Sequence, residues 1–288
     1  MNRLEKKDRL VRVALLVVAF SAVSILAVIT VFMFQQGTPI MFKYGLKNFL
    51  AGSDWYPSEK SFGLWPMIVG SIYVTFGAMV IGVPFGLACA IALTEFSSKR
   101  VRGVIKPVIE LLAGIPSVVY GFMGVVILVP FIRQTLGGPG LSVLAASIIL
   151  GIMILPTIIS ISVDSIQAIP PAYREGSIAL GATRWQTVRM VLLPAARSGI
   201  IASIILGMGR AIGETMAVIM IAGNAVSVPR SVLAPVRTLT SNIALEMGYA
   251  AGEHRQALFA TGVILFVIIM ILNTVANVTS SRRKKAKG

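Results

Sequence analysis

Long uncharged stretches recur along this chain. No Asp, Glu, Lys or Arg occurs in residues 13–34, 61–94, 111–132, 134–163 or 256–281. A helix needs about 20 predominantly apolar residues to cross a bilayer, and each of these runs reaches that length. One such run could be a buried helix of a soluble protein, but their repetition within 288 residues indicates a membrane protein.

The pattern predicts six transmembrane helices and therefore an all-α, polytopic fold. Residues 198–222 supply a further segment, since they are apolar apart from Arg210 and Glu214. The composition agrees: 56% of residues are hydrophobic and only 13% are charged, against about 25% charged in soluble domains. The predicted spans are about residues 13–34, 67–93, 111–131, 141–163, 198–222 and 257–279.

This pattern also sets the domain organisation. We expect a basic cytoplasmic head at 1–12, a transmembrane domain at 13–281 that includes a polar cytoplasmic loop at 164–197, and a basic tail at 282–288. The basic start and the first apolar run could also be a signal peptide. We expect an uncleaved helix, because the run at 13–34 exceeds a signal-peptide core of about 7–15 residues and no A-x-A-like site follows.

The net charge of +15 raises the question of a nucleic-acid partner, but its distribution favours a membrane topology. An even number of spans puts both termini on one side, and that side holds 18 of the 26 Lys and Arg residues. The opposite side holds seven, and Arg210 lies within a span. The basic side of a membrane protein stays in the cytoplasm. We therefore expect a multi-pass protein of the cytoplasmic (inner) membrane, in contact with lipid, with both termini inside.

Two loops carry further expectations. Apolar residues at helical spacing predict an interfacial helix on the outer surface: Phe42, Leu46, Phe49 and Leu50. The neighbouring aromatic residues Trp55, Tyr56 and Trp65 are typical of a belt at the membrane interface. Residues 94–107 are expected to form a basic inner loop.

Catalytic and metal chemistry find little support in the sequence. Cys89 is the only cysteine and His254 the only histidine, so no cysteine-based metal site is possible within one chain. We expect His254 to be a solvated side chain in an outer loop. No Gly-Lys-Ser or Gly-Lys-Thr occurs, so a P-loop is absent from the sequence. If ATP drives this protein, its hydrolysis belongs to another chain, and no catalytic or metal-binding residue is assigned here.

Arg210 and Glu214 are the sharpest chemical feature of the spans. They lie four residues apart in the fifth predicted helix and should share a face with Ser203. Ionisable groups at this depth are costly unless they are paired or hydrated, and they usually mark a transport path. One interpretation is a salt bridge that only fixes packing. We favour the other, a lining for an ion path.

The polar loop between the fourth and fifth spans carries a recognisable spacing. Glu175-Gly176-Ser177, then Gly181, then Val191, Leu193 and Pro194 match the pattern E-A-A-x-x-x-G-x(9)-I-x-L-P without a gap, although Gly176, Ser177 and Val191 replace Ala, Ala and Ile. This loop resembles the cytoplasmic coupling loop of ABC importer permeases. The resemblance implies a type I permease fold, with a helix, a turn and a second helix that dock in a groove of a separate ATPase.

A second stretch narrows the resemblance. Residues 207–218, Gly-Met-Gly-Arg-Ala-Ile-Gly-Glu-Thr-Met-Ala-Val, are similar to the fifth-helix motif of the Pst phosphate importer permeases. Residues 55–71 are similar to the outer loop of the PstC-type subunit more than to the PstA type. The implied path residues are Arg210, Glu214, Ser203 and Thr215. The implied coupling residues are Glu175, Gly176, Ser177, Gly181, Leu193 and Pro194.

The resemblance also implies partners. They are a homologous PstA-like permease, two PstB-like ATPase subunits that hold the ATP and Mg, and an extracytoplasmic PstS-like phosphate-binding protein. No cofactor is expected on this chain. Two alternatives remain open: a permease for another small oxyanion, or a secondary transporter driven by an ion gradient. A secondary transporter would not need the 175–194 loop, and an intramembrane enzyme would need a nucleophile–base pair or metal set within the spans.

Overall fold

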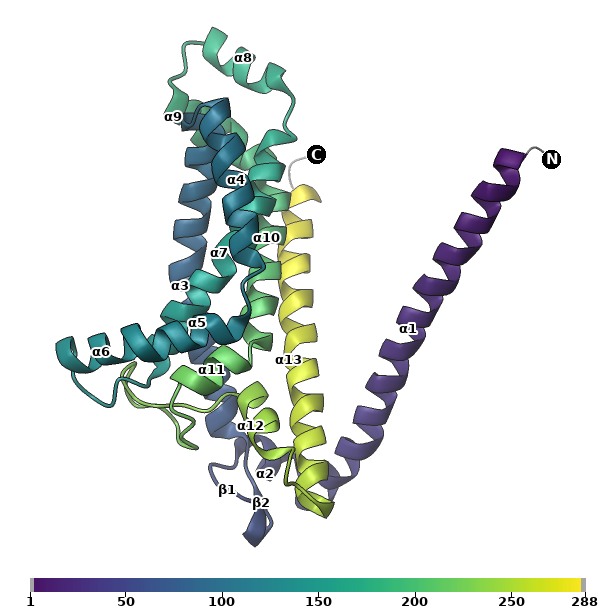
Figure 1. Ribbon diagram of the computed structural model, residues 1–288, viewed down its shortest axis with the longest axis vertical. Helices are drawn as coiled ribbons and strands as arrows, with labels where there is room; N and C mark the ends of the chain where they lie inside the picture. Colours follow the sequence, from purple (N-terminus) through teal and green to yellow (C-terminus); the bar gives the residue numbers. More distant parts are fainter. Residues whose placement is uncertain (1–2, 286–288) are drawn as a thin grey trace.

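Nearly the whole chain is helical in this computed structural model, which describes residues 3–285 and the side chains of residues 11–275 (Figure 1). Helices satisfy their own backbone hydrogen bonds, which lipid cannot do. Six stretches are long and apolar enough to cross a membrane: Val11–Tyr44, Trp65–Phe96, Ser117–Thr135, Val143–Gln167, Arg184–Gly213 and Gly252–Val275. The predicted all-α fold with six membrane helices is confirmed.

The long helices set the frame of the molecule. They are α1 (Arg3–Tyr44), α3 (Trp65–Ile91), α7 (Val143–Gln167), α10 (Leu193–Gly213) and α13 (Gly252–Lys285). Residues 3–12 of the expected basic head continue α1 as helix, and residues 282–285 continue α13. Residues 1–2 and 286–288 lie outside the described residues. The first turn of α1 and the last turn of α13 point toward the same end of the molecule (Figure 1).

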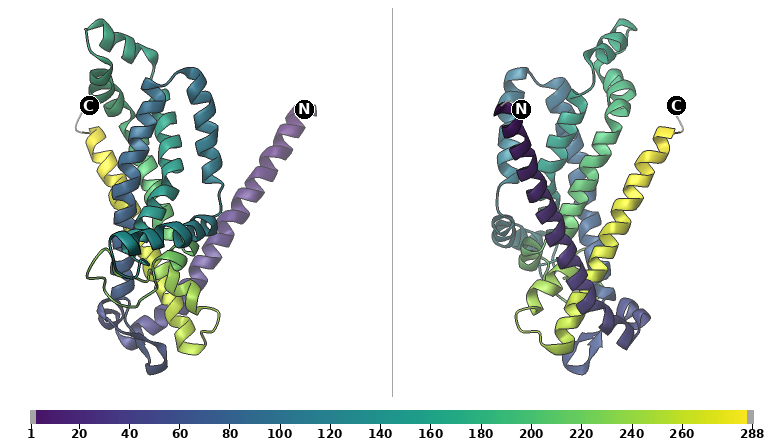
Figure 2. Two further views of the ribbon diagram at one scale, coloured as in Figure 1. Left: turned by 60° about the vertical axis from the view of Figure 1, so that its left-hand side comes forward. Right: turned by 90° about the vertical axis from the view of Figure 1, so that its right-hand side faces the viewer.

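The core of the bundle is formed by α3, α7 and α10, which stand side by side (Figure 2). Leu150, Ile154 and Ile158 of α7 are almost completely buried against these neighbours. Glycine lets the helices approach closely: a Cβ added at Gly82 of α3 would lie 2.6 Å from Ile154 and 3.0 Å from the carbonyl oxygen of Gly151. Small residues at helix contacts serve the same purpose in membranes generally.

Within residues 11–275, helix α1 contacts the rest of the chain near its C-terminal end. There its Gly37 faces Ala260 of α13, and Phe32 packs edge-on against Phe259 with ring centroids 5.5 Å apart. From this contact α1 and α13 diverge, and α1 stands apart from the bundle (Figures 1 and 2). Its apolar side chains between Val11 and Val31 are therefore exposed in the single chain.

The third predicted span, about residues 111–131, does not form one continuous helix, and the apolar helical stretch found there is Ser117–Thr135. Helix α4 (Lys99–Ala113) occupies most of the segment expected to be a basic loop, and it ends at the Gly114-Ile115-Pro116 break. The chain then turns into α5 (Ser117–Met123), the π-helical turn η3 (Gly124–Leu128) and α6 (Val129–Thr135). These three run across the bundle (Figure 1). Proline explains the break, because it lacks an N–H and disfavours helical geometry at the residue before it.

The opposite end of the molecule from the chain termini holds the short elements. They are α2 (Leu46–Ala51), β1 (Trp55–Tyr56), the 3₁₀ turn η1 (Pro57–Glu59), β2 (Ser61–Phe62), α11 (Met216–Ile221) and α12 (Leu239–Glu246). Strands β1 and β2 pair antiparallel, with Trp55 opposite Phe62. The interfacial-helix prediction is wrong in part: α1 continues through Phe42 to Tyr44, and Phe49 of α2 is 1% exposed, in the core.

The predictions for Trp55 and His254 are wrong, because both side chains contact the buried carboxylate of Glu246. Trp55, expected in an aromatic belt, is 4% exposed and donates from Nε1 to Glu246 Oε2 at 2.8 Å. His254, expected to be solvated, lies 2.8 Å from the same oxygen through Nε2. Arg237 donates to Glu246 Oε1 at 2.6 Å, so the carboxylate is paired. Trp55 reaches Glu246 across 191 residues of the chain, so its burial follows from a long-range tertiary contact.

Candidate functional site

A helical elbow projects from the end of the molecule where the termini lie (Figure 1). It consists of α8 (Pro171–Ala179) and α9 (Arg184–Thr187), and the π-helical turn η4 (Val188–Leu192) joins α9 to α10. Proline at the first position of α8 suits a helix start, where its missing N–H has no partner to lose. The residues Glu175, Gly176 and Ser177 all lie in α8.

Local hydrogen bonds fix the turn of the elbow. Gly181 has a φ of +82°, and its N–H donates to the Ile178 carbonyl at 2.9 Å. The Ala182 N–H donates to the Ser177 carbonyl at 3.1 Å, which completes a Schellman cap. Thr183 and Gln186 then form a capping box that begins α9. Gly181 is needed for its left-handed backbone and not for space, since an added Cβ would meet nothing within 4 Å.

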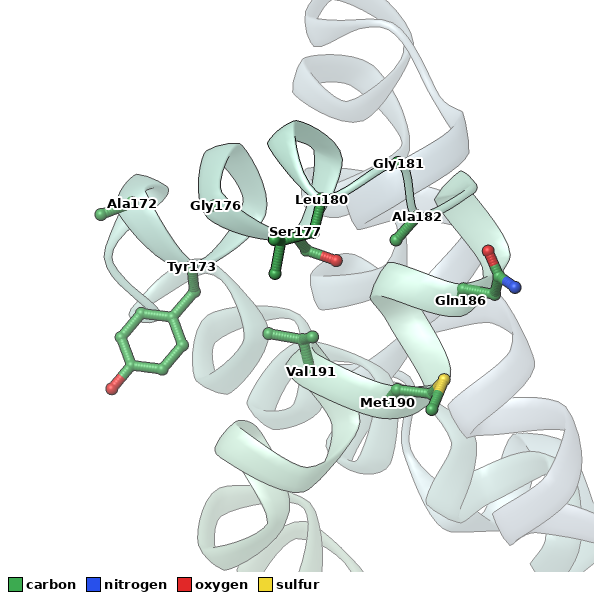
Figure 3. A pocket seen from close by; sticks show the side chains of 10 residues that line it. All are labelled: Ala172, Tyr173, Gly176, Ser177, Leu180, Gly181, Ala182, Gln186, Met190 and Val191. Atoms are coloured by element: carbon green, nitrogen blue, oxygen red, sulfur yellow. The ribbon is translucent and has the colours of Figure 1, made fainter.

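A groove of about 740 Å³ lies between α8 and the η4 turn (Figure 3). Large apolar side chains lie on or beside it unburied: Leu180 is 91% exposed, Met190 72% and Trp185 55%. Exposed apolar surface of this kind marks an interaction site. The lining residues are Ala172, Tyr173, Gly176, Ser177, Leu180, Gly181, Ala182, Gln186, Met190 and Val191.

The predicted coupling residues separate into two groups. Gly176, Ser177 and Gly181 line the groove, and Ser177 is hydrogen-bonded to Thr187 at 3.0 Å. Glu175 is exposed on α8.

The last two predicted coupling residues, Leu193 and Pro194, lie at the start of α10 and do not line the groove. Leu193 is partly buried and packs against the bundle. Sequence reasoning missed Tyr173, Leu180 and Met190. The signal available was the presence of large apolar residues inside an otherwise polar loop.

The fifth predicted span ends earlier than expected. Helix α10 stops at Gly213, and Glu214 is its extended C-cap residue. The prediction that Arg210 and Glu214 share one face of a continuous helix is therefore wrong. Glu214 Oε1 instead accepts hydrogen bonds from the backbone N–H groups of Thr215 at 3.0 Å and Ala217 at 3.2 Å, at the start of α11. A carboxylate suits this place, because the N-terminal N–H groups of a helix lack partners.

Arg210 is exposed, and among residues 11–275 no ion pair joins it to Glu214 or to another side chain. It continues an exposed row on α10 with Ser198, Ala202 and Leu206 at intervals of four. A cation cannot face lipid cheaply at this depth. This face of α10 therefore requires protein or water against it, and Arg210 is available to attract an anion.

The two other predicted path residues are placed differently. Ser203 is fully buried between α7 and α10, where its hydroxyl lies 3.0 Å from that of Ser162. Thr215 is part-exposed beside Glu214, and its hydroxyl donates to the Gly213 carbonyl at 3.2 Å. Within residues 11–275, no three His, Cys, Asp or Glu side chains gather in a way that could hold a metal ion.

The family of this chain is clear from comparison with known proteins. Residues 82–285 match the model of the family described as the binding-protein-dependent transport system inner membrane component. The chain belongs to this family. The permease is 43% identical over 283 residues to the probable ABC transporter permease protein YqgH of Bacillus subtilis (strain 168), covering 95% of this chain and 92% of that protein.

A second relative and a solved structure are also similar to the permease. It is 37% identical over 250 residues to the phosphate transport system permease protein PstC of Mesorhizobium japonicum, covering 80% of this chain and 76% of that protein. A chain of the crystal structure of a bacterial alginate ABC transporter, in complex with an alginate pentasaccharide-bound periplasmic protein, shares its fold. That match has a TM-score of 0.67 and 16% identity, covering 97% of this chain and 96% of that chain. The permease is thus a multi-pass membrane subunit with the ABC importer type I fold.

Proposed function

We propose that this permease is a PstC-type membrane subunit of an ABC importer for inorganic phosphate. The observation that carries the choice of substrate is the 37% identity to a phosphate transport permease over 80% of this chain. The sequence at 207–218, which contains Arg210, supports the same choice. The exposed cation on α10 fits an anionic substrate.

The elbow is the proposed docking surface for a separate ATPase subunit. The groove beside α8 presents Leu180 and Met190 to solvent, and these side chains supply the apolar contact that a partner would cover. In this proposal the partner binds the ATP and Mg and performs the hydrolysis. The permease itself has no catalytic role, and it transmits the movement of the elbow to the membrane helices.

The proposed orientation puts the elbow and both termini in the cytoplasm. Lys and Arg concentrate on that side of the predicted topology, and the elbow lies at the same end as the first turn of α1 and the last turn of α13 (Figure 1). The protein is then an inner-membrane subunit whose β1–β2 hairpin and α12 face outward, toward a phosphate-binding protein.

The proposed path runs along the exposed face of α10, which a homologous permease subunit would complete. Arg210 offsets phosphate charge there, and Thr215 lies just beyond the C-terminal end of the helix. Ser203, buried against α7, would position α10. A full transporter then contains this chain, its PstA-like homologue, two ATPase subunits and the external binding protein.

Purification of the complex from its native membrane tests this proposal. We expect an ATPase subunit to co-purify, and we expect liposomes containing the complex to take up phosphate only with ATP inside and the binding protein outside. Sulfate in place of phosphate is the matched control. Uptake driven by an ion gradient without ATP would contradict the proposal, and preferential uptake of sulfate would contradict the choice of substrate.

A further inference from the structure

Among the side chains of residues 11–275, one ion pair joins helix α8 to the membrane bundle. Arg174 of α8 donates from Nη2 to Glu95 Oε1 at 2.6 Å and from Nε to both carboxylate oxygens at 3.2 Å. Both side chains are largely buried, with 27% of Arg174 and 13% of Glu95 exposed. No residue of α8 is itself fully buried. The helix thus lacks the apolar packing that would hold it in place without this pair.

Glu95 lies in η2 (Ala92–Phe96), the π-helical turn that ends α3. This turn is held from a second side by Arg102 of α4, which donates from Nε to the Leu93 carbonyl at 2.8 Å and from Nη2 to the Thr94 carbonyl at 2.6 Å. Single π-helical turns inside helices are frequent at functional sites. The end of α3 is therefore fixed to α4 by Arg102 and to α8 by Arg174.

The geometry of the pair suits the transmission of movement. A guanidinium and a carboxylate joined through two donors form a charge-assisted contact with a defined orientation. Arg174 also places Nη2 3.4 Å from the Ile166 carbonyl near the end of α7, so it bridges the two central helices. Because α3 and α7 pack closely at Gly82 and Gly151, a displacement of η2 moves a rigid pair of helices.

We propose that the Arg174–Glu95 pair is the positioning contact that carries movement of α8 to the inner end of α3. This inference rests on the proposed function of the elbow as the ATPase-docking surface. Neither residue touches the transported ion. Arg174 acts through Glu95, and the pair converts a push on α8 into a displacement of the transmembrane core.

A double-mutant cycle on the purified complex tests this role. We expect Glu95→Gln and Arg174→Gln each to retain the ATPase subunit but to lower phosphate uptake per ATP hydrolysed about tenfold, within the range of typical coupling energies. The double variant should be no worse than either single variant, because both remove the same contact. Arg174→Lys, which keeps the charge, should recover part of the ratio.

The matched control is Lys106→Gln. Lys106 forms a comparable ion pair with Asp164 at 2.5 Å, between α4 and α7, and does not touch α8. Its substitution should leave the uptake-to-hydrolysis ratio unchanged. A normal ratio in Glu95→Gln would overturn the proposal. Loss of the ATPase subunit in both Glu95→Gln and Arg174→Lys would also overturn it, because the pair would then only anchor the docking surface.

A distance measurement separates this inference from the choice of substrate. Spin labels at Ser97, just after η2, and at Ala179 of α8 report whether the two segments move together. We expect the same label distance with and without trapped nucleotide in the otherwise unaltered complex, and a nucleotide-dependent distance in Glu95→Gln. A nucleotide-dependent distance in the unaltered complex would overturn the link. This result does not depend on which ion is transported.

Discussion

Arg210 is notable because, among residues 11–275, it forms no ion pair. The sequence predicted that Arg210 and Glu214 share one helix face, but Glu214 turns away to accept hydrogen bonds from Thr215 and Ala217. A lone exposed cation on a membrane helix has no packing role that would explain its presence. We propose that Arg210 lines the transport path, in agreement with the proposed anionic substrate.

We expect Arg210→Gln to abolish phosphate uptake, a loss of at least about 100-fold, because the charge that offsets the anion in a low-dielectric path is removed. The complex should still assemble. Adding Glu214→Gln should not restore uptake, because the two side chains are not paired. Uptake into cells, with co-purified ATPase as the measure of assembly, checks both statements.

Arg230→Gln is the control, since Arg230 is an exposed cation in the outer loop. It should transport normally. Recovery of uptake in the Arg210→Gln, Glu214→Gln double variant would show that the two residues act as a pair after all.

Substitutions of Gly181 can distinguish the effect of its backbone conformation from the effect of an added side chain. Its φ of +82° costs other residues about 1–2 kcal/mol, with Asn the best tolerated, while its surroundings are open. We expect Gly181→Val to reduce ATPase retention strongly and Gly181→Asn to retain most of it. Quantitative co-purification measures both. Equal losses in the two variants would show that the side chain blocks the partner directly, and not through the turn.

At the scale of elements, the close contact of α3 and α7 is what makes the core rigid. An added methyl at Gly82 would meet the buried Ile154 side chain and the Gly151 backbone. We expect Gly82→Ala to destabilise the purified permease by about 1–3 kcal/mol, as overpacking of a tight core does. The thermal unfolding midpoint in detergent, followed by tryptophan fluorescence, would fall accordingly.

Gly103 of α4 provides the matched control, because an added Cβ there would meet nothing within 4 Å. Gly103→Ala should be neutral or stabilising by up to about 1 kcal/mol, since alanine is the better helix former. Equal destabilisation by both substitutions would argue against the close packing of α3 and α7 as the source of the effect.

Two helices also end at other residues than the hydropathy pattern predicts. The chain breaks at Gly114-Ile115-Pro116, between α4 and α5, whereas hydropathy alone shows one uncharged run over residues 111–132. Likewise, α10 ends at Gly213, although the apolar pattern continues to 222. The chain can leave helical geometry there because Glu214 and Thr240 supply new hydrogen bonds to the turn and to α11.

At the scale of the whole molecule, the arrangement of the ends predicts a labelling pattern. Cys89 is first replaced by Ala, and single cysteines are placed at Ser58 and Thr183, at opposite ends of the structure. We expect a membrane-impermeant maleimide to label Ser58→Cys in intact cells and Thr183→Cys only after permeabilisation, because the basic side faces the cytoplasm. External labelling of Thr183→Cys would reverse the proposed orientation.

The single chain also leaves much of its apolar surface uncovered. Along α1, between Val11 and Val31, the side chains are exposed because this helix diverges from the bundle (Figure 2). Lipid satisfies such a surface without further protein, so α1 needs no packing partner along this length. The exposed row of α10 differs, because it ends in the charge of Arg210.

The sequence by itself determined the features that depend on local chemistry. Long uncharged runs fix the number of spans, since lipid imposes both apolarity and helical length. The helix–turn–helix elbow also depends on local chemistry, because the positive φ of Gly181 and the Thr183 capping box each involve residues only a few positions apart.

Only the tertiary structure decided which distant groups meet. It brought the buried Trp55 to Glu246 across 191 residues, and it brought Arg174 to Glu95 across 79 residues. The tertiary structure also places the Glu214 carboxylate against the first turn of α11 and not against Arg210. Hydropathy and sequence spacing do not predict such contacts, because the contacts form only when the helices pack. The partner that packing brings near a buried charge then offsets the cost of burying that charge.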